Sequence, residues 1–290
     1  EINYGDAHFR RSDAGNALYN PFVENNLLDA FTTEIGGELY WQKSGFLVMA
    51  GLTDGEVQGS VTKGEDRKPS LYGKVGYDNI VAEDLRIRVT GSFYRTKSSI
   101  SNTLYGGDRA GSRYYFVMEA PNATLTGNAF SGRINPGFRD NVSSFMINPF
   151  IKYKSFELFG TYEVAQGNSH VENGEVQSTD PAQPVLTSLE DRQVNQYAID
   201  GLYRFANNRM YVGAKYNVVA GDLSFASSTT QPNISQGVRE NVSVERTAVA
   251  AGWFITPNIL MKVEYVTQRY FDFPAADLRS NGKFEGFVVE

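Results

Sequence analysis

The chain has 290 residues, of which 41% are hydrophobic and 21% charged, with a formal net charge of -6 and no cysteine. No run approaches the roughly 18 consecutive apolar residues that a membrane-spanning helix needs, which excludes a helical membrane protein. The chain also contains no cysteine-based metal site and no phosphate-binding glycine loop of the Walker type. We therefore expect no cofactor and no nucleic-acid partner.

Polar and apolar residues alternate one by one in many segments of the chain. In 84–96, for example, Leu85, Ile87 and Val89 alternate with Arg86 and Arg88. A period of two residues places the two sets on opposite faces of a strand. Several of these runs reach about ten to thirteen residues, which suits a tilted strand that crosses a bilayer. The pattern predicts an all-β chain, namely a transmembrane antiparallel up-and-down β-barrel that forms one domain over residues 1–290.

About twelve strands are expected, and their number would rise to 14–18 if residues are missing from the termini. The expected strands are 2–9, 32–42, 46–53, 71–78, 84–96, 143–153, 155–165, 193–205, 209–221, 243–255, 258–270 and 282–290. The connections between them are alternately short and long, which is typical of outer-membrane barrels with short periplasmic turns and long external loops. The strand-like run 113–119 fits this scheme only as a hairpin inside the long connection 97–142.

The two faces of the expected strands differ in chemistry. The apolar set includes Val212 and carries aromatic residues near strand ends, where membrane interfaces favour them: Trp41, Tyr77, Tyr153, Phe156, Tyr203, Phe205 and Trp253. The polar set contains charged residues, and each Lys or Arg that faced lipid at the midplane would cost roughly 2–4 kcal/mol. We therefore expect a polar lumen. Its expected pore-lining, anion-contacting cations are Lys74, Arg86, Arg88, Lys152, Arg204, Lys215 and Lys262.

Arg86 and Arg88 are the strongest candidates for contact with an anion. They lie two residues apart, so both guanidinium groups point to the same face and can offer paired donors. The alternative is that both arginines pair with carboxylates of the wall, for which Asp84 or Glu163 are the expected partners.

The connection 10–31 begins with Arg10 and Arg11. Such a long loop either folds into the lumen as a constriction loop or lies outside the barrel. Near it, His8 lies two residues after Asp6, so both side chains would share one face of a strand, a pattern compatible with a metal pair or with a base and its orienting group. The sequence contains no evident third ligand.

The run from Tyr4 to Asp13, followed by Asn20-Pro21-Phe22 and 29–34, resembles porin-like outer-membrane proteins of Bacteroidota-type bacteria, which are distantly similar to phosphate-selective porins. The stretch from Lys262 through Gly286 resembles the closing hairpin of that group. The resemblance implies a passive, anion-preferring and trimeric channel. Acidic residues interrupt the ladder of cations, however, which is a departure from the phosphate-selective pattern.

The leading interpretation is an outer-membrane porin through which small hydrophilic, in particular anionic, solutes diffuse passively. We expect no enzymatic activity, and we expect outer-membrane lipid and lipopolysaccharide as surroundings, with a homotrimer or larger complex as the assembly. The first alternative is a plugged barrel that serves as an accessory subunit of an uptake or secretion complex. Large apolar residues expected to point inward favour it: Met146, Phe150, Phe159 and Phe287. The second alternative is an outer-membrane hydrolase that uses His8.

Overall fold

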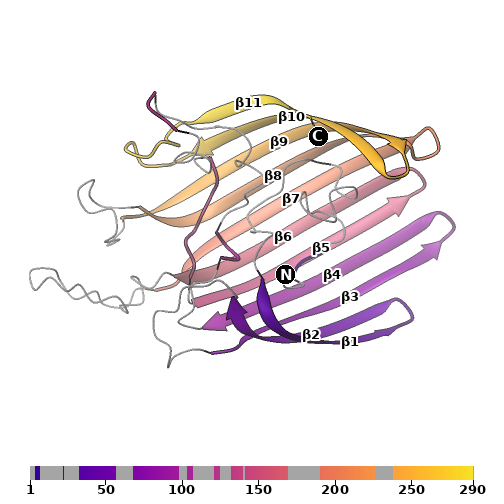
Figure 1. Cartoon of the computed structure of the whole chain (residues 1–290), viewed down its shortest axis with the longest axis horizontal. Coiled ribbons are helices and arrows are strands. Elements are labelled where there is room, and N and C mark those ends of the chain that lie inside the picture. The colour runs from indigo at the N-terminus through magenta and orange to yellow at the C-terminus, as the bar shows by residue number, and fades with distance from the viewer. Residues whose placement is uncertain are drawn as a thin grey trace, which may run out of the picture.

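A computed structural model describes residues 4–6, 22, 33–56, 68–97, 103–106, 121–124, 132–139, 141–168, 190–225 and 238–289. These residues contain one antiparallel sheet of eleven strands, in which each strand pairs with its neighbours in the sequence (Figure 1). The strands are β1 (Glu34–Lys43), β2 (Phe46–Glu56), β3 (Ser70–Ala82), β4 (Leu85–Lys97), β5 (Asn141–Tyr153), β6 (Phe156–Asn168), β7 (Arg192–Phe205), β8 (Met210–Phe225), β9 (Val238–Thr256), β10 (Ile259–Phe271) and β11 (Lys283–Val289). Within the described residues, no helix is long and apolar enough to cross a membrane.

All the expected strands from 32–42 to 282–290 are confirmed, most of them to within a few residues. The expected strand 2–9 is wrong where it can be compared, because residues 4–6 form no strand and pack against the inner side of the sheet. Alternation of polar and apolar residues therefore does not by itself distinguish the confirmed strands from the segment 4–6. The run 113–119 lies outside the described residues.

Short turns and long connections alternate as predicted. The strands are joined by short turns at 44–45, 83–84, 154–155, 206–209 and 257–258, and by longer connections at the other end of the sheet. Four of these turns contain residues with positive φ, such as Asp84 at 62° and Lys154 at 52°. Tight hairpin turns need this conformation to match the twist of the flanking strands. We call the two ends of the sheet the short-turn end and the long-connection end.

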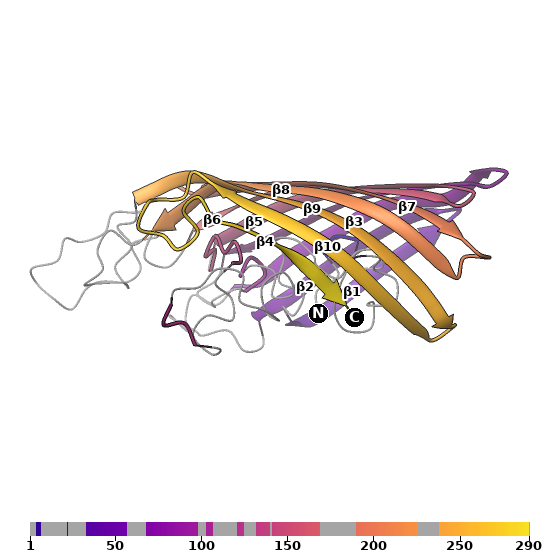
Figure 2. The same ribbon diagram turned by 90° about the horizontal axis from the view of Figure 1, so that it is seen from above.

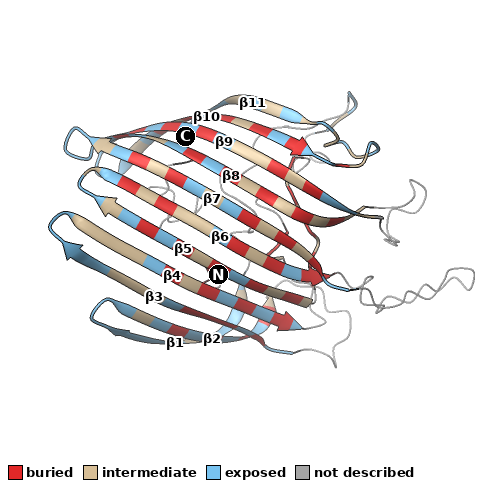
Figure 3. Cartoon of the chain, turned by 180° about the vertical axis from the view of Figure 1, so that it is seen from behind, coloured by how far each residue is buried: buried red, intermediate tan, exposed pale blue. Residues whose placement is uncertain are grey.

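The sheet is curved, so that β1 and β11, its two edges, bend toward the same side (Figure 2). Burial alternates from residue to residue along the central strands, as a view from behind shows (Figure 3). On β8, Val212 is 46% exposed on the convex face, whereas Lys215 is 4% exposed on the concave face. The predicted assignment of apolar and charged residues to opposite faces is confirmed at these positions.

The convex face carries aromatic residues in two rows with aliphatic residues between them. The first row lies at the short-turn end and consists of Trp41, Phe46, Tyr77, Tyr153, Phe156, Tyr203, Phe205 and Trp253. The second lies nearer the long-connection end and consists of Phe93, Phe145, Tyr162, Tyr197, Tyr216, Tyr265 and Phe287. Within the second row, the rings of Tyr162 and Tyr197 lie 5.1 Å apart. Two aromatic rows that flank an aliphatic band are typical of a sheet that faces lipid.

Candidate functional site

The concave face carries the cations that the sequence predicted for the pore wall. Lys74, Lys215 and Lys262 are buried on it. The other four are partly exposed: the side chains of Arg86 and Lys152 by 40% and 36%, and those of Arg88 and Arg204 by 13% and 18%. Strands β3, β4, β5, β7, β8 and β10 each contribute at least one of the seven. The period of two residues thus brings together cations that lie up to 188 positions apart in the sequence.

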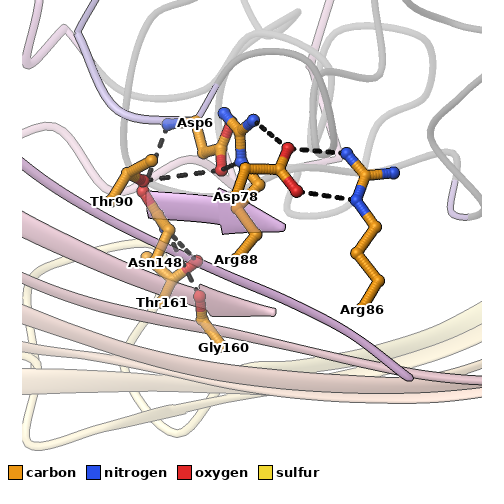
Figure 4. A network of polar contacts seen from close by, with 8 residues as sticks. All are labelled: Asp6, Asp78, Arg86, Arg88, Thr90, Asn148, Gly160 and Thr161. Carbon is orange, nitrogen blue, oxygen red and sulfur yellow. Dashed lines mark hydrogen bonds and ion pairs between the residues drawn. The ribbon is translucent and has the colours of Figure 1, made fainter. Parts of the chain in front are cut away.

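Arg86 and Arg88 both bind the carboxylate of Asp78 (Figure 4). Arg86 donates two hydrogen bonds to it, from Nε at 2.7 Å and from Nη2 at 2.6 Å. Arg88 donates a third from Nη1 at 3.1 Å. Asp78 lies directly opposite Arg88 in the β3–β4 pairing. The two guanidinium groups are therefore fixed by a carboxylate of the neighbouring strand.

The second carboxylate at this cluster comes from outside the sheet. Arg88 donates to Asp6 from Nε at 2.7 Å and from Nη2 at 2.6 Å. The Asp6 side chain is fully buried, and its backbone N–H donates to Oδ1 of Asn148 on β5 at 3.1 Å. The expected partners Asp84 and Glu163 are wrong. Asp84 occupies the turn, and Glu163 binds Tyr105 instead.

Three cations and a carboxylate form a second cluster at the short-turn end of the concave face. Glu157 accepts hydrogen bonds from Nζ of Lys152 at 3.0 Å and from Nε of Arg204 at 2.8 Å. In the strand register, Lys152 lies directly opposite Arg86 of β4 on one side and directly opposite Glu157 of β6 on the other. The guanidinium of Arg204 also lies 5.6 Å from the centre of the Tyr211 ring. This row places cations and a carboxylate side by side across four strands.

Tyrosine hydroxyls bind carboxylates at three places on the same wall. Tyr94 donates to Glu34 at 2.6 Å, and Tyr72 donates to Glu38 at 2.6 Å. The third pair joins Glu163 of β6 to Tyr105, which lies in a connection, at 2.5 Å. Burial, reinforced by the charge of Glu163, raises the pKa of the Tyr105 hydroxyl well above its ordinary value, so it stays a donor. These pairs leave no local signal in the sequence, because the partners lie 34 to 60 positions apart.

Short parts of the long connections pack into the concave face. Thr103 donates its backbone N–H and its hydroxyl to Glu56 of β2, both at 2.6 Å. The hydroxyls of Tyr105 and Tyr4 lie 3.3 Å apart, within hydrogen-bond distance, which links two of these inward segments. Phe138 is buried with the guanidinium of Arg192 over its ring at 5.2 Å. The inner side of the sheet is therefore partly filled by chain from other segments.

A single described residue represents the connection 10–31. Phe22 is fully buried among Leu202, Tyr211, Ala248 and Ala250, with Nζ of Lys215 5.6 Å from the centre of its ring. Phe22 and the segment 4–6 both lie on the concave face. Arg10 and Arg11, the expected constriction residues, lie between them in the sequence and outside the described residues.

Both histidines also lie outside the described residues, and Asp6, the expected neighbour of His8, binds Arg88. Within the described parts of the chain, no three acidic or histidine side chains come together as a metal site.

Of the large apolar residues that were expected to point inward, Met146, Phe150 and Phe159 are buried on the concave face. The expectation for Phe287 is wrong, because its side chain is 75% exposed. It lies opposite Tyr265 on the convex face, with the ring centres 4.9 Å apart. The cause is the pairing register, which places residue 287 of β11 beside an outward-facing residue of β10.

An antiparallel up-and-down sheet with an apolar, aromatic-bordered convex face and a charged concave face defines an outer-membrane β-barrel protein. The convex face has the chemistry expected of a surface that contacts lipid, and the concave face has the chemistry expected of a lumen wall.

No protein-family model matches the chain, and no curated protein matches it. Among solved structures, an anion-selective porin from Comamonas acidovorans is similar over 87% of this chain, with 11% identity and a TM-score of 0.43. OprD of Pseudomonas aeruginosa is similar over 89% of this chain and 69% of its own, with 10% identity and a TM-score of 0.42. The outer-membrane protein OmpT of Vibrio cholerae is similar over 87%, with 12% identity and a TM-score of 0.40. The chain spans 53% of the Comamonas porin and 61% of the Vibrio protein. These likenesses concern the fold alone.

Proposed function

We propose that the chain forms a channel through which small hydrophilic solutes diffuse passively across the outer membrane. The concave face carries this proposal, because it places cations and carboxylates from most strands on one wall. Such a wall suits a water-filled lumen, where charges cost little, whereas each cation would cost roughly 2–4 kcal/mol at the lipid midplane. The convex face supplies the lipid-facing surface that a channel wall needs.

We further propose that the lumen is narrowed from inside by the connection that contains Arg10 and Arg11. Tyr4, Asp6 and Phe22, which flank these two arginines in the sequence, all pack on the concave face. The preference for anionic solutes remains part of this proposal. It is attributed to Lys74, Arg86, Arg88, Lys152, Arg204, Lys215 and Lys262, although carboxylates accompany several of them.

Conductance of the full chain in planar lipid bilayers tests the channel. The expected result is stepwise current that grows with salt concentration and passes at both polarities. Heat-modifiable electrophoretic mobility shows whether the protein is folded. Folded protein that passes no current would contradict a channel.

A plugged barrel that serves as an accessory subunit of a larger complex is the second candidate. The inward segments 4–6, 103–106 and 132–139 favour it, because they are fixed to the wall by Arg88, Glu56 and Arg192. Folded protein that conducts no current but co-purifies with a stable partner after mild detergent extraction would support this candidate.

The homotrimer stays a prediction, which native mass spectrometry of the extracted protein tests.

A further inference from the structure

Arg88 binds Asp6 in the geometry that arginine uses for a free carboxylate. Two of its nitrogens donate to the two oxygens of Asp6, at 2.7 Å and 2.6 Å. The hydroxyl of Thr90 donates to the same carboxylate at 3.4 Å. A bidentate guanidinium–carboxylate pair of this kind is among the strongest charge-assisted hydrogen-bond arrangements in proteins.

The surroundings of Asp6 are rich in cations. Lys74 is 4% exposed and interacts electrostatically with both Asp6 and Arg88. The nearby carboxylate of Asp78 is held by two nitrogens of Arg86 (Figure 4). Lys74 also interacts electrostatically with Glu38, so the three cations of this cluster face the carboxylates of Asp6, Asp78 and Glu38. Removal of the charge of Asp6 would take a carboxylate partner away from Arg88 and Lys74.

The wall of the recess belongs to the sheet, whereas its occupant comes from a separate segment. Arg88, Thr90 and Lys74 belong to strands β4 and β3. Asn148 of β5 accepts the Asp6 N–H and is itself fixed by Thr161 at 3.1 Å. Asp6 reaches the recess from a non-strand segment that turns at Gly5, whose φ of 70° disfavours a side chain. Asp6 is thus a carboxylate carried into a site that the sheet alone builds.

We propose that this recess is a carboxylate-binding site of the channel wall and that Asp6 is its tethered occupant. The solute class is small organic acids, whose carboxylate displaces Asp6 and releases the segment Tyr4–Asp6 from the wall. In this exchange one carboxylate leaves the two Arg88 nitrogens and another takes its place, so no buried charge is left uncompensated. The passage of such solutes rests on the proposed channel function, whereas the site itself does not.

The test uses Asp6→Ala in the full chain, refolded into vesicles and titrated with formate. The substitution empties the recess, so formate should raise the thermal unfolding temperature in a saturable manner, because a ligand that binds only the folded state stabilises it. In the wild type the tethered carboxylate competes at an effective concentration of about millimolar or more. Half-saturation by formate should therefore need at least about tenfold more formate in the wild type than in Asp6→Ala.

Three controls separate this site from general salt effects. Formamide, which has nearly the same shape and no charge, should not stabilise Asp6→Ala. Asp191→Ala should respond to formate only as the wild type does, because it keeps Asp6 in the recess and Asp191 accepts from the amides of Asn141 and Asn168 elsewhere on the sheet. The double variant Asp6→Ala with Arg88→Gln should lose the response. Equal effects of formate on Asp6→Ala and on Asp191→Ala would overturn the proposal.

Conductance separates the site from the channel. If formate stabilises Asp6→Ala while the wild type passes no current, the recess stands as a carboxylate site and the channel function falls. If the wild type conducts but formate does not stabilise Asp6→Ala, the recess falls alone. If Asp6→Ala does not refold, the wild-type current is measured with increasing formate. Saturable modulation of that current by formate, but not by formamide and not in Arg88→Gln, supports the site. If formate does not modulate the wild-type current, the proposed site is overturned.

Discussion

Ile199 of β7 tests the lipid-facing surface at the scale of one residue. It is 51% exposed and lies between Tyr197 and Tyr203, which belong to the two aromatic rows. We expect Ile199→Arg to lower the free energy of unfolding in lipid vesicles by roughly 2–4 kcal/mol, because the cation would sit near the midplane. Ile199→Met, which is long but apolar, should refold like the wild type.

Val212 provides an internal comparison for the same experiment. It lies directly opposite Tyr203 of the aromatic row, and hence near an interface. A cation there should cost only about 0–1 kcal/mol, because the penalty falls with distance from the midplane. A larger cost at Val212 than at Ile199 would mean that the aromatic rows do not mark the membrane boundaries.

Some side-chain partners were predictable from hairpin register, and others were not. Asp78 lies opposite Arg88, and Lys152 lies opposite Glu157, across the short turns that the sequence indicates. Counting outward from the turn 154–155 gives Lys152 opposite Glu157. Counting from the turn 83–84 would place Val89 opposite Asp78, because the register shift between Ile80 and Ala82 moves the pairing by one residue. The contact between Arg88 and Asp6 spans 82 positions and leaves no local signal. Only the folded chain reveals it.

At the scale of elements, the connection between β10 and β11 contains an ion pair that predicts a pH dependence. Asp277 accepts from Nε and Nη2 of Arg279, both at 2.8 Å, and Arg279 lies 4.6 Å from the ring centre of Phe273. Burial alone would raise the pKa of Asp277, but the hydrogen bonds and charge of Arg279 outweigh it and lower the pKa. The stabilisation is therefore complete above the unfolded-state pKa of about 3.9 and is lost as the pH falls through the folded-state pKa.

The resulting measurement compares the wild type with Asp277→Asn. We expect the wild type to be more stable near neutral pH, and the difference should shrink as the pH is lowered from about 5 toward 3. Thermal unfolding in vesicles, followed by circular dichroism, records both curves. A difference that stays constant across this range would show that the charge of Asp277 contributes nothing.

The orientation of the sheet can be tested with a glutamate-specific protease on intact cells. Glu172 and Glu175 belong to the connection between β6 and β7 at the long-connection end, whereas Glu83 lies in a short turn. Because outer-membrane barrels place long connections outside the cell, cleavage should occur at 172–175. Glu83 should be cut only after the outer membrane is permeabilised. Cleavage at Glu83 in intact cells would invert the topology.

The strands themselves were predictable because their signal is local. Alternation with a period of two, together with turn residues between runs, gives the position and the face of a strand without knowledge of its neighbours. The same signal failed at 4–6, where contacts with Arg88 and Asn148 fix the chain in another conformation. It also failed at Phe287. This residue lies in the short edge strand β11, and the pairing register with β10 determines which face its side chain occupies.

At the scale of the whole molecule, the concave wall has no single sign of charge. Carboxylates accompany its cations in each cluster, for example Asp78 beside Arg86 and Glu157 beside Lys152 and Arg204. The proposed preference of the wild type for small anions over cations should therefore be weak. Under this interpretation, selectivity is a balance that the loss of one charge can shift in either direction.

Glu157 and Lys152 test this balance with opposite expected signs. Glu157→Gln removes the carboxylate that Lys152 and Arg204 share, so the reversal potential in a salt gradient should shift toward anion permeation. Lys152→Gln leaves the pair of Glu157 and Arg204 intact and should shift it toward cations. Both shifts should be largest near 0.01 M salt, where the screening length is about 30 Å, and should shrink toward 1 M, where it is about 3 Å. If both variants moved the potential in the same direction, solutes would not pass along this wall.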